Sequence, residues 1–143
     1  MAENMTEDEV RDKAREILGL NNHGGRAIVG VGQLTTFNQL GFKGKLDKPD
    51  GWYLPSAKTD TAVVLETKAS KIALGASQVK ELLKNIRIMN AKYEHVVGIL
   101  YNGESTRVFS YTESVIPILL AVFVLMYLER ALEKIIPQIV QII

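Results

Sequence analysis

The sequence has no cysteine among its 143 residues, which excludes disulfide scaffolds, thiolate zinc sites and cysteine nucleophiles. Histidine occurs only as His23 and His95, too few for a histidine-rich metal site. The acidic amino terminus lacks the basic flank and the uninterrupted apolar region of a secretory signal. These absences favour a cytoplasmic protein in a reducing compartment.

Long apolar runs are also scarce, and the longest covers residues 115–128 between Glu113 and Glu129. Its length is below the roughly 20 residues that span a bilayer core, and Pro117 interrupts it, so a membrane partner is not favoured. A helix that is apolar all round must be buried on more than one side. We therefore expect residues 112–143 to form an apolar helical tail that packs or oligomerises. An intramolecular core, an interface and membrane association remain its three alternatives.

The composition is that of one folded domain, because 47% of the residues are apolar and 23% are charged. The net charge of +1 conceals an uneven distribution. Residues 41–92 carry ten Lys or Arg against five Asp or Glu. Such a basic band either attracts phosphates or forms a solvated face with surplus lysine.

Hydrophobic periodicity predicts alternating helices and strands. Thr6 and Glu9 have the spacing of a capping box, and the apolar positions that follow recur at helical spacing up to Gly19. Asn102-Gly103, a dipeptide favoured in type I′ turns, joins two β-rich runs and predicts an antiparallel hairpin. Between these segments the pattern predicts strands at 27–32, 52–54 and 61–69 and a second amphipathic helix at 76–91.

The chemistry is concentrated at the end of the apolar strand Thr61–Ala69. Residues two apart in a strand point to the same face, so Glu66 and Lys68 emerge together. Asp50 belongs to a neighbouring strand across a short turn and is expected to reach the same point. Two converging carboxylates form a hard oxygen site suited to Mg²⁺, while an exposed ion pair beside a turn aspartate is the structural alternative.

Pro49-Asp50 followed by Glu66-Thr67-Lys68 resembles the motif of the PD-(D/E)xK nuclease superfamily. The resemblance covers residues 6–111 and is strongest to nuclease domains of restriction-modification enzymes, of the type I motor subunit and fused nuclease-methyltransferase kinds. It implies a restriction-endonuclease-like α/β fold, with a mixed central sheet flanked by helices. We expect residues 1–111 to form this nuclease-like domain, followed by the apolar tail.

The resemblance assigns Asp50, Glu66 and the backbone carbonyl of Thr67 to a Mg²⁺ ion, for which Mn²⁺ can substitute. It assigns Lys68 to the attacking water. Gln78, ten residues after Lys68, matches the glutamine that follows the motif in these domains, although Leu82 stands where their tyrosine would be.

Further residues are assigned around this centre. An acidic residue of the first helix often lies near the metal in these domains, and Glu16 and Glu9 are the candidates here. Four lysines around the motif are expected to neutralise DNA phosphates, namely Lys43, Lys45, Lys48 and Lys71. Trp52 and Tyr53 fill the core or contact DNA.

The resulting functional hypothesis is a Mg²⁺-dependent DNA endonuclease that hydrolyses phosphodiesters in a restriction-modification or related defence system. Its substrate would be double-stranded DNA, and its partners a second copy or a methyltransferase, specificity or motor subunit. A homodimeric nuclease similar to Holliday-junction resolvases and a non-cleaving DNA-binding or assembly subunit are the alternatives.

Overall fold

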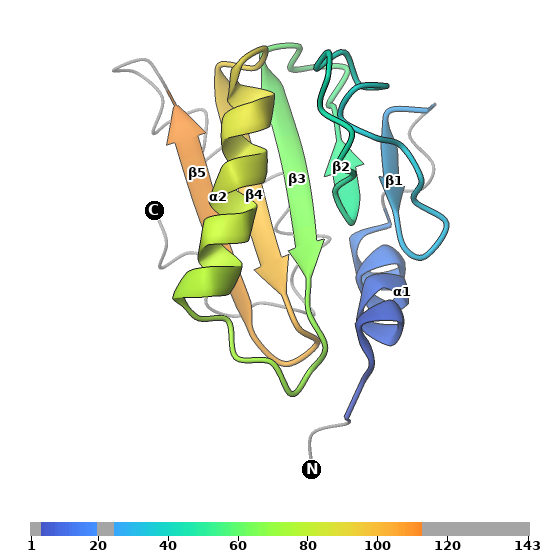
Figure 1. Ribbon diagram of the computed structural model, residues 1–143. Helices are drawn as coiled ribbons and strands as arrows, with labels where there is room; N and C mark the ends of the chain where they lie inside the picture. Colours follow the sequence, from blue (N-terminus) through green and yellow to red (C-terminus); the bar gives the residue numbers. More distant parts are fainter. Residues whose placement is uncertain (1–3, 20–24, 113–143) are drawn as a thin grey trace.

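The computed structural model describes residues 4–19 and 25–112 as a five-stranded mixed sheet with a helix on each face (Figure 1). The strands lie side by side in chain order, and only β3 and β4 are parallel. The elements are α1 (Glu7–Leu18), β1 (Ala27–Val29), β2 (Gly51–Tyr53), β3 (Thr61–Thr67), α2 (Ala76–Asn90), β4 (His95–Tyr101) and β5 (Thr106–Thr112). The expected α/β class, with a mixed sheet flanked by helices, is therefore confirmed.

Helix α1 begins and ends where the sequence predicts. The Thr6 hydroxyl accepts a hydrogen bond from the Glu9 N–H (3.3 Å), and the Glu9 carboxylate accepts one from the Thr6 N–H (2.7 Å). This reciprocal cap satisfies two N–H groups that the first turn leaves without intrahelical partners. Gly19 ends the helix in the left-handed conformation, at a φ of 57°.

Strand β3 separates two hydrophobic clusters because its successive side chains face opposite sides of the sheet. Val63 and Leu65 belong to the cluster that contains the buried residues of α1. Ala62 and Val64 belong to the cluster beneath α2. All seven residues of β3 are buried, so the strand that carries Glu66 is fixed from both faces.

Helix α2 connects the parallel strands β3 and β4 and packs closely on the sheet at Gly98 of β4. A Cβ atom at this glycine would collide with the side chain of Ile86 and lie 3.2 Å from a methyl group of Leu82. The missing side chain therefore sets how near α2 comes to the sheet. It thereby also sets how near the polar residues of α2 come to the end of β3.

The β4–β5 hairpin is confirmed, but its turn is not of type I′. Tyr101 pairs with Thr106, which leaves four residues in the connection, and only Gly103 has a positive φ (88°). A type I′ turn needs positive φ at both central residues. Asn102 instead accepts hydrogen bonds from the N–H groups of Glu104 (3.0 Å) and Ser105 (2.7 Å) through its side chain.

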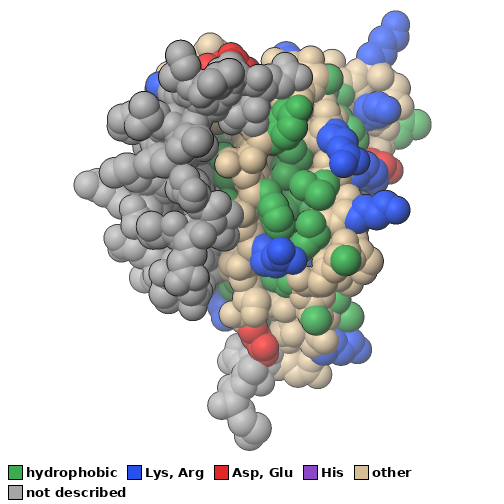
Figure 2. All heavy atoms as spheres, turned by 90° about the vertical axis from the view of Figure 1, so that its left-hand side faces the viewer, with side chains coloured by type: hydrophobic (Ala, Val, Ile, Leu, Met, Phe, Trp, Pro, Cys, Tyr) green, Lys and Arg blue, Asp and Glu red, His purple; other side chains and the backbone are tan. Residues whose placement is uncertain are grey.

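The side of the molecule that carries β5 is partly apolar. Figure 2 faces this side and shows hydrophobic side chains gathered in its middle, with Lys and Arg side chains along one border. Phe109 of β5 and Val79 and Leu83 of α2 are half-buried. The predicted apolar tail, residues 112–143, lies outside the described residues except for Thr112, which is the last residue of β5. Within residues 4–19 and 25–112, neither helix has the length and apolar character needed to cross a membrane.

Candidate active site

A polar cavity of about 480 Å³ lies where β3 ends and β2 begins. Its walls come from α1, from the residues that precede β2, from the end of β3 and from α2. The charged residues that line it include Glu7, Arg11, Asp50, Glu66, Lys68 and Glu81. The structure therefore brings the three motif side chains into one cavity.

Asp50 is held in place by three hydrogen-bonded contacts. One carboxylate oxygen, Oδ2, accepts hydrogen bonds from the backbone N–H (2.7 Å) and the hydroxyl (2.9 Å) of Thr67. The other oxygen, Oδ1, pairs with the Arg11 guanidinium at 2.9 Å. The next residue, Gly51, lets β2 pack closely between β1 and β3, because a Cβ atom there would lie 2.7 Å from a methyl group of Val29 and 3.2 Å from one of Leu65. Asp50 is thus fixed against the end of β3 before any ligand binds.

Glu66 is buried on the α2 side of β3, where the Asn85 amide donates a hydrogen bond to its Oε1. Burial raises the pKa of this carboxyl to about 9, with further contributions from the negative charges of Asp50 and Glu81. A hydrogen bond with Asp50 acts in the same direction, while the positive charge of Lys68 acts against it. In the absence of a cation, Glu66 is therefore protonated at neutral pH.

Lys68 points to the same side of the sheet as Glu66, as strand parity predicts. Its Nζ pairs with Glu81 of α2 at 2.7 Å. Burial lowers the pKa of this ammonium, but the hydrogen bond and charge of Glu81 and the charges of Glu66 and Glu7 outweigh it and raise the pKa overall. Lys68 therefore remains charged and is held at the cavity wall by α2.

The first helix contributes a residue that the sequence analysis did not select. Glu7 lines the cavity and pairs with Arg11 at 2.7 Å, whereas Glu9 is used in the helix cap. Glu16 is exposed and does not line the cavity. Glu16 lies nine positions after Glu7. Because each residue turns the helix by about 100°, Glu16 lies on the side of α1 opposite to Glu7. The expectation that Glu16 lies near the metal does not fit this geometry.

Gln78 is near the site in sequence, but its side chain is used to cap α2. Its side-chain oxygen accepts a hydrogen bond from the Gly75 N–H (3.1 Å) and caps α2. It is not among the residues that line the cavity. Glu81 and Asn85, three and seven residues later on the same helical stripe, reach Lys68 and Glu66 instead. The i+3 and i+7 spacing from Gln78 is the signal that could have identified them.

The four predicted DNA-binding lysines are all exposed but lie in different places. Lys48 lines the cavity, while Lys43 and Lys45 line a neighbouring groove. Lys71 lies in the connection between β3 and α2 and lines neither.

The two aromatic residues of β2 lie in the core. Trp52 and Tyr53 are both buried, on opposite sides of the sheet. The Trp52 indole N–H donates to the side-chain oxygen of Gln33 at 3.2 Å. Of the two alternatives for these residues, core packing is therefore correct.

A second group of potential metal ligands lies at the other end of β3, and the sequence analysis did not identify it. It consists of Asp60, Glu94 and His95, whose ligand atoms lie within 4.8 Å of one another. The buried His95 imidazole is 3.5 Å from Asp60 and 4.0 Å from Glu94. Asp60 and Glu94 immediately precede β3 and β4, whereas Glu66 lies near the opposite end of β3.

Comparison with protein families, with curated proteins and with solved structures finds no match to this chain.

Proposed function

We propose that this chain is a Mg²⁺-dependent DNA endonuclease of the PD-(D/E)xK superfamily, with a restriction-endonuclease-like fold. The observation that carries the proposal is the convergence of Asp50, Glu66 and Lys68 in one polar cavity. Asp50 immediately precedes β2, and Glu66 lies in the antiparallel neighbour β3. The two carboxyls interact directly, and the lysine lies two residues beyond the glutamate.

The donor set fits a hard divalent cation. Asp50 and Glu66 supply carboxylate oxygens, and the Thr67 carbonyl lies between Glu66 and Lys68 in the chain. The raised pKa of Glu66, caused first by burial and then by Asp50 and Glu81, marks a place where two neighbouring negative charges are costly. A divalent cation bound there would offset this repulsion, polarise the scissile phosphate and lower the pKa of the attacking water.

The cationic side chains of Lys68 and Arg11 have different roles in this proposal. Lys68 would donate a hydrogen bond to the water and fix its direction of attack, while Glu81 steadies the ammonium group. Arg11 pairs with Asp50, but it also pairs with Glu7 (2.7 Å) and Asp8 (3.0 Å). Because these two partners remain, Arg11 can release Asp50 to a cation without becoming unpaired.

Lys48 and Lys84 lie at the cavity wall and would neutralise phosphates that flank the cut. The proposed setting is a restriction-modification or related defence system in the cytoplasm. A second copy, or a methyltransferase, specificity or motor subunit, would supply sequence recognition.

A cleavage assay with Mg²⁺ or Mn²⁺ on plasmid DNA tests the proposal. Asp50→Asn and Lys68→Ala should each reduce the rate by at least about 100-fold, since each removes a group that acts on the reacting atoms. Asp60→Asn is the matched control, because it makes the same change in the other candidate metal cluster and should retain activity. Loss of activity in Asp60→Asn alone would move the chemistry to that cluster and contradict the proposal.

A second candidate is a non-cleaving DNA-binding or assembly subunit. The ion pairs Arg11–Asp50 (2.9 Å) and Lys68–Glu81 (2.7 Å) favour it, because they satisfy the motif charges without a metal. Calorimetric titration with Mn²⁺ separates the two. Uptake by the wild type that is lost in Asp50→Asn supports the nuclease, whereas no uptake supports the non-cleaving subunit.

A further inference from the structure

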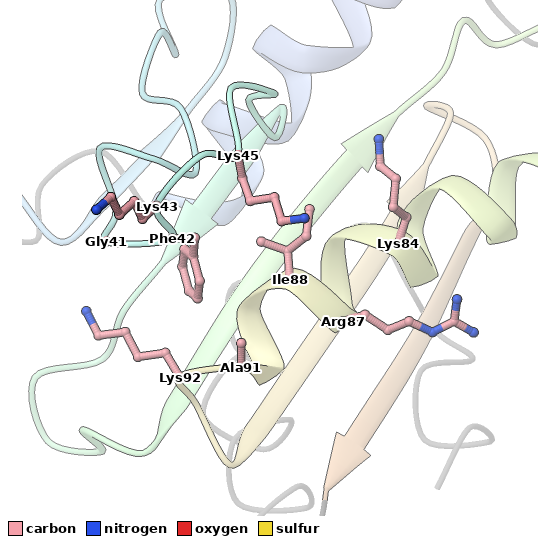
Figure 3. A pocket seen from close by; sticks show the side chains of 9 residues that line it. All are labelled: Gly41, Phe42, Lys43, Lys45, Lys84, Arg87, Ile88, Ala91 and Lys92. Carbon is pink, nitrogen blue, oxygen red and sulfur yellow. The ribbon is translucent and has the colours of Figure 1, made fainter.

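A groove of about 700 Å³ lies beside the candidate active site, between the loop that contains residues 41–45 and the second half of α2 (Figure 3). Lys43 and Lys45 stand on the loop wall. Lys84 and Arg87 of α2 and Lys92, just after its end, stand on the helix wall. In Figure 3 the Lys45 side chain reaches across toward Ile88, and Lys92 extends toward the loop.

The charge on this groove is of one sign. Five cationic side chains line it, and no carboxylate does so among the residues that the structure describes. Lys84 is paired with Asp47 at 3.1 Å, but Asp47 faces the active-site cavity and not the groove. A concave surface with cations on both walls concentrates a positive potential, so its complementary ligand is a polyanion.

The floor of the groove is apolar and includes Phe42, Ile88 and Ala91. The Phe42 ring is held by the rings of Phe37 and Tyr93, with centroids 6.2 and 6.3 Å away. Phosphate groups alone need no apolar floor. Nucleic-acid bases do, because their faces lose contact with water when they lie on aromatic or aliphatic side chains.

The groove adjoins the active-site cavity. Lys84 lines both, and the loop supplies consecutive walls, with Lys43 and Lys45 in the groove and residues 46–48 in the cavity. A strand whose phosphate lies at Asp50 and Glu66 would pass Lys84, which is paired with Asp47, before it enters the groove.

We propose that the groove binds an unpaired DNA strand that extends from the cleavage site. This rests on the proposed nuclease function and specifies its substrate class as duplex DNA with a single-stranded extension. In a duplex the base faces are stacked inside, and a protein surface meets only phosphates, sugars and base edges, so the apolar floor would contact no base face. An unpaired strand places its phosphates on the two cationic walls and its bases on the floor.

Binding in EDTA tests this independently of catalysis. Fluorescence anisotropy would compare a labelled blunt duplex, the same duplex with a ten-nucleotide extension, and the extension alone. The wild type should bind the extended duplex at least tenfold more tightly than the blunt one. The double variant Lys45→Ala/Lys92→Ala should reduce the steepness with which the logarithm of the binding constant falls with the logarithm of the salt concentration by about 1.4. This corresponds to a loss of affinity of roughly 25-fold at 0.1 M salt. Lys13→Ala/Lys58→Ala, an equal charge change elsewhere, should retain the preference.

A second pair of variants tests the groove while its Lys and Arg side chains remain unchanged. Ala91→Glu places a carboxylate on the groove floor, whereas Ala57→Glu places one in the exposed β2–β3 turn. Only the first should abolish the preference for the extension. Equal binding of both duplexes, or equal effects of both variants, would overturn the proposal. If the protein cleaves blunt duplex but does not prefer the extended duplex, the groove proposal is refuted and the nuclease proposal stands. If it prefers the extended duplex but does not cleave, the nuclease proposal is refuted and strand binding by the groove stands.

Discussion

Replacement of Glu66 by glutamine tests the electrostatics of the site without a metal or substrate. Burial, with Asp50 and Glu81 next, raises the pKa of Glu66 to about 9 from an ordinary value of 4.5. At pH values between these two pKa values, Glu66 keeps its proton in the folded protein but has lost it in the unfolded chain. The free energy of unfolding therefore falls as pH rises. The loss is about 1.4 kcal/mol per pH unit, or roughly 4 kcal/mol between pH 5 and pH 8. Glutamine has nearly the same shape and never ionises, so Glu66→Gln removes this dependence.

The assay is urea unfolding in EDTA at several pH values, with the wild type compared with Glu66→Gln. The variant should gain stability relative to the wild type steadily from pH 5 to pH 8, and the difference should level off above about pH 9. Glu104→Gln makes the same change at an exposed turn position, where the carboxyl is solvated in both states, and should show no such trend. A difference between wild type and Glu66→Gln that does not vary with pH would refute the reasoning.

Two further predictions concern the metal and the packing of α2. Because a cation needs Glu66 ionised, Mg²⁺ binding at pH 7 should release about one proton per ion, and affinity should rise about tenfold per pH unit from pH 6 to pH 8. Calorimetry in buffers of different ionisation enthalpy measures this, and an ion that binds without proton release would contradict it. Gly98→Ala should cost about 1–3 kcal/mol in urea unfolding because the added methyl collides with Ile86. Gly32→Ala, with open space around it, is the control, and equal stability of the two variants would contradict the close approach of α2.

The elements were predictable because their signals are local. The Thr6 and Glu9 cap, the apolar alternation of β3 and the helical stripe of α2 each depend on neighbours in the chain. Strand parity predicted that Glu66 and Lys68 share a face, and the neighbouring strand and the resemblance of the motif predicted that Asp50 joins them. The periodicity of the sequence also predicts that the β4–β5 turn lies near Asn102. The length of the four-residue connection depends on tertiary contacts, because Asn102 is buried and its amide donates to the Ile72 carbonyl at 2.8 Å.

The partners of the motif residues were not predictable in the same way. Asn85 reaches Glu66, and Glu81 reaches Lys68, only because the crossover between the parallel strands places α2 on the face that carries both motif residues. Glu7 was missed in favour of Glu16, although it lies three residues before Val10 and so continues the buried stripe of α1. The apolar stripe was therefore the signal that could have identified it.

The brevity of β2 has a consequence for how the candidate site would be lost. Only three residues of this strand pair with β3, and only three pair with β1 beyond it. The central part of the sheet is held by seven paired positions between β3 and β4 and seven between β4 and β5. Opening of the short edge costs less free energy than complete unfolding, and it carries Asp50 away from Glu66 while the rest of the sheet remains. If the proposed function holds, heat would then abolish cleavage below the melting temperature, and amide hydrogens of β2 would exchange with solvent before those of β4.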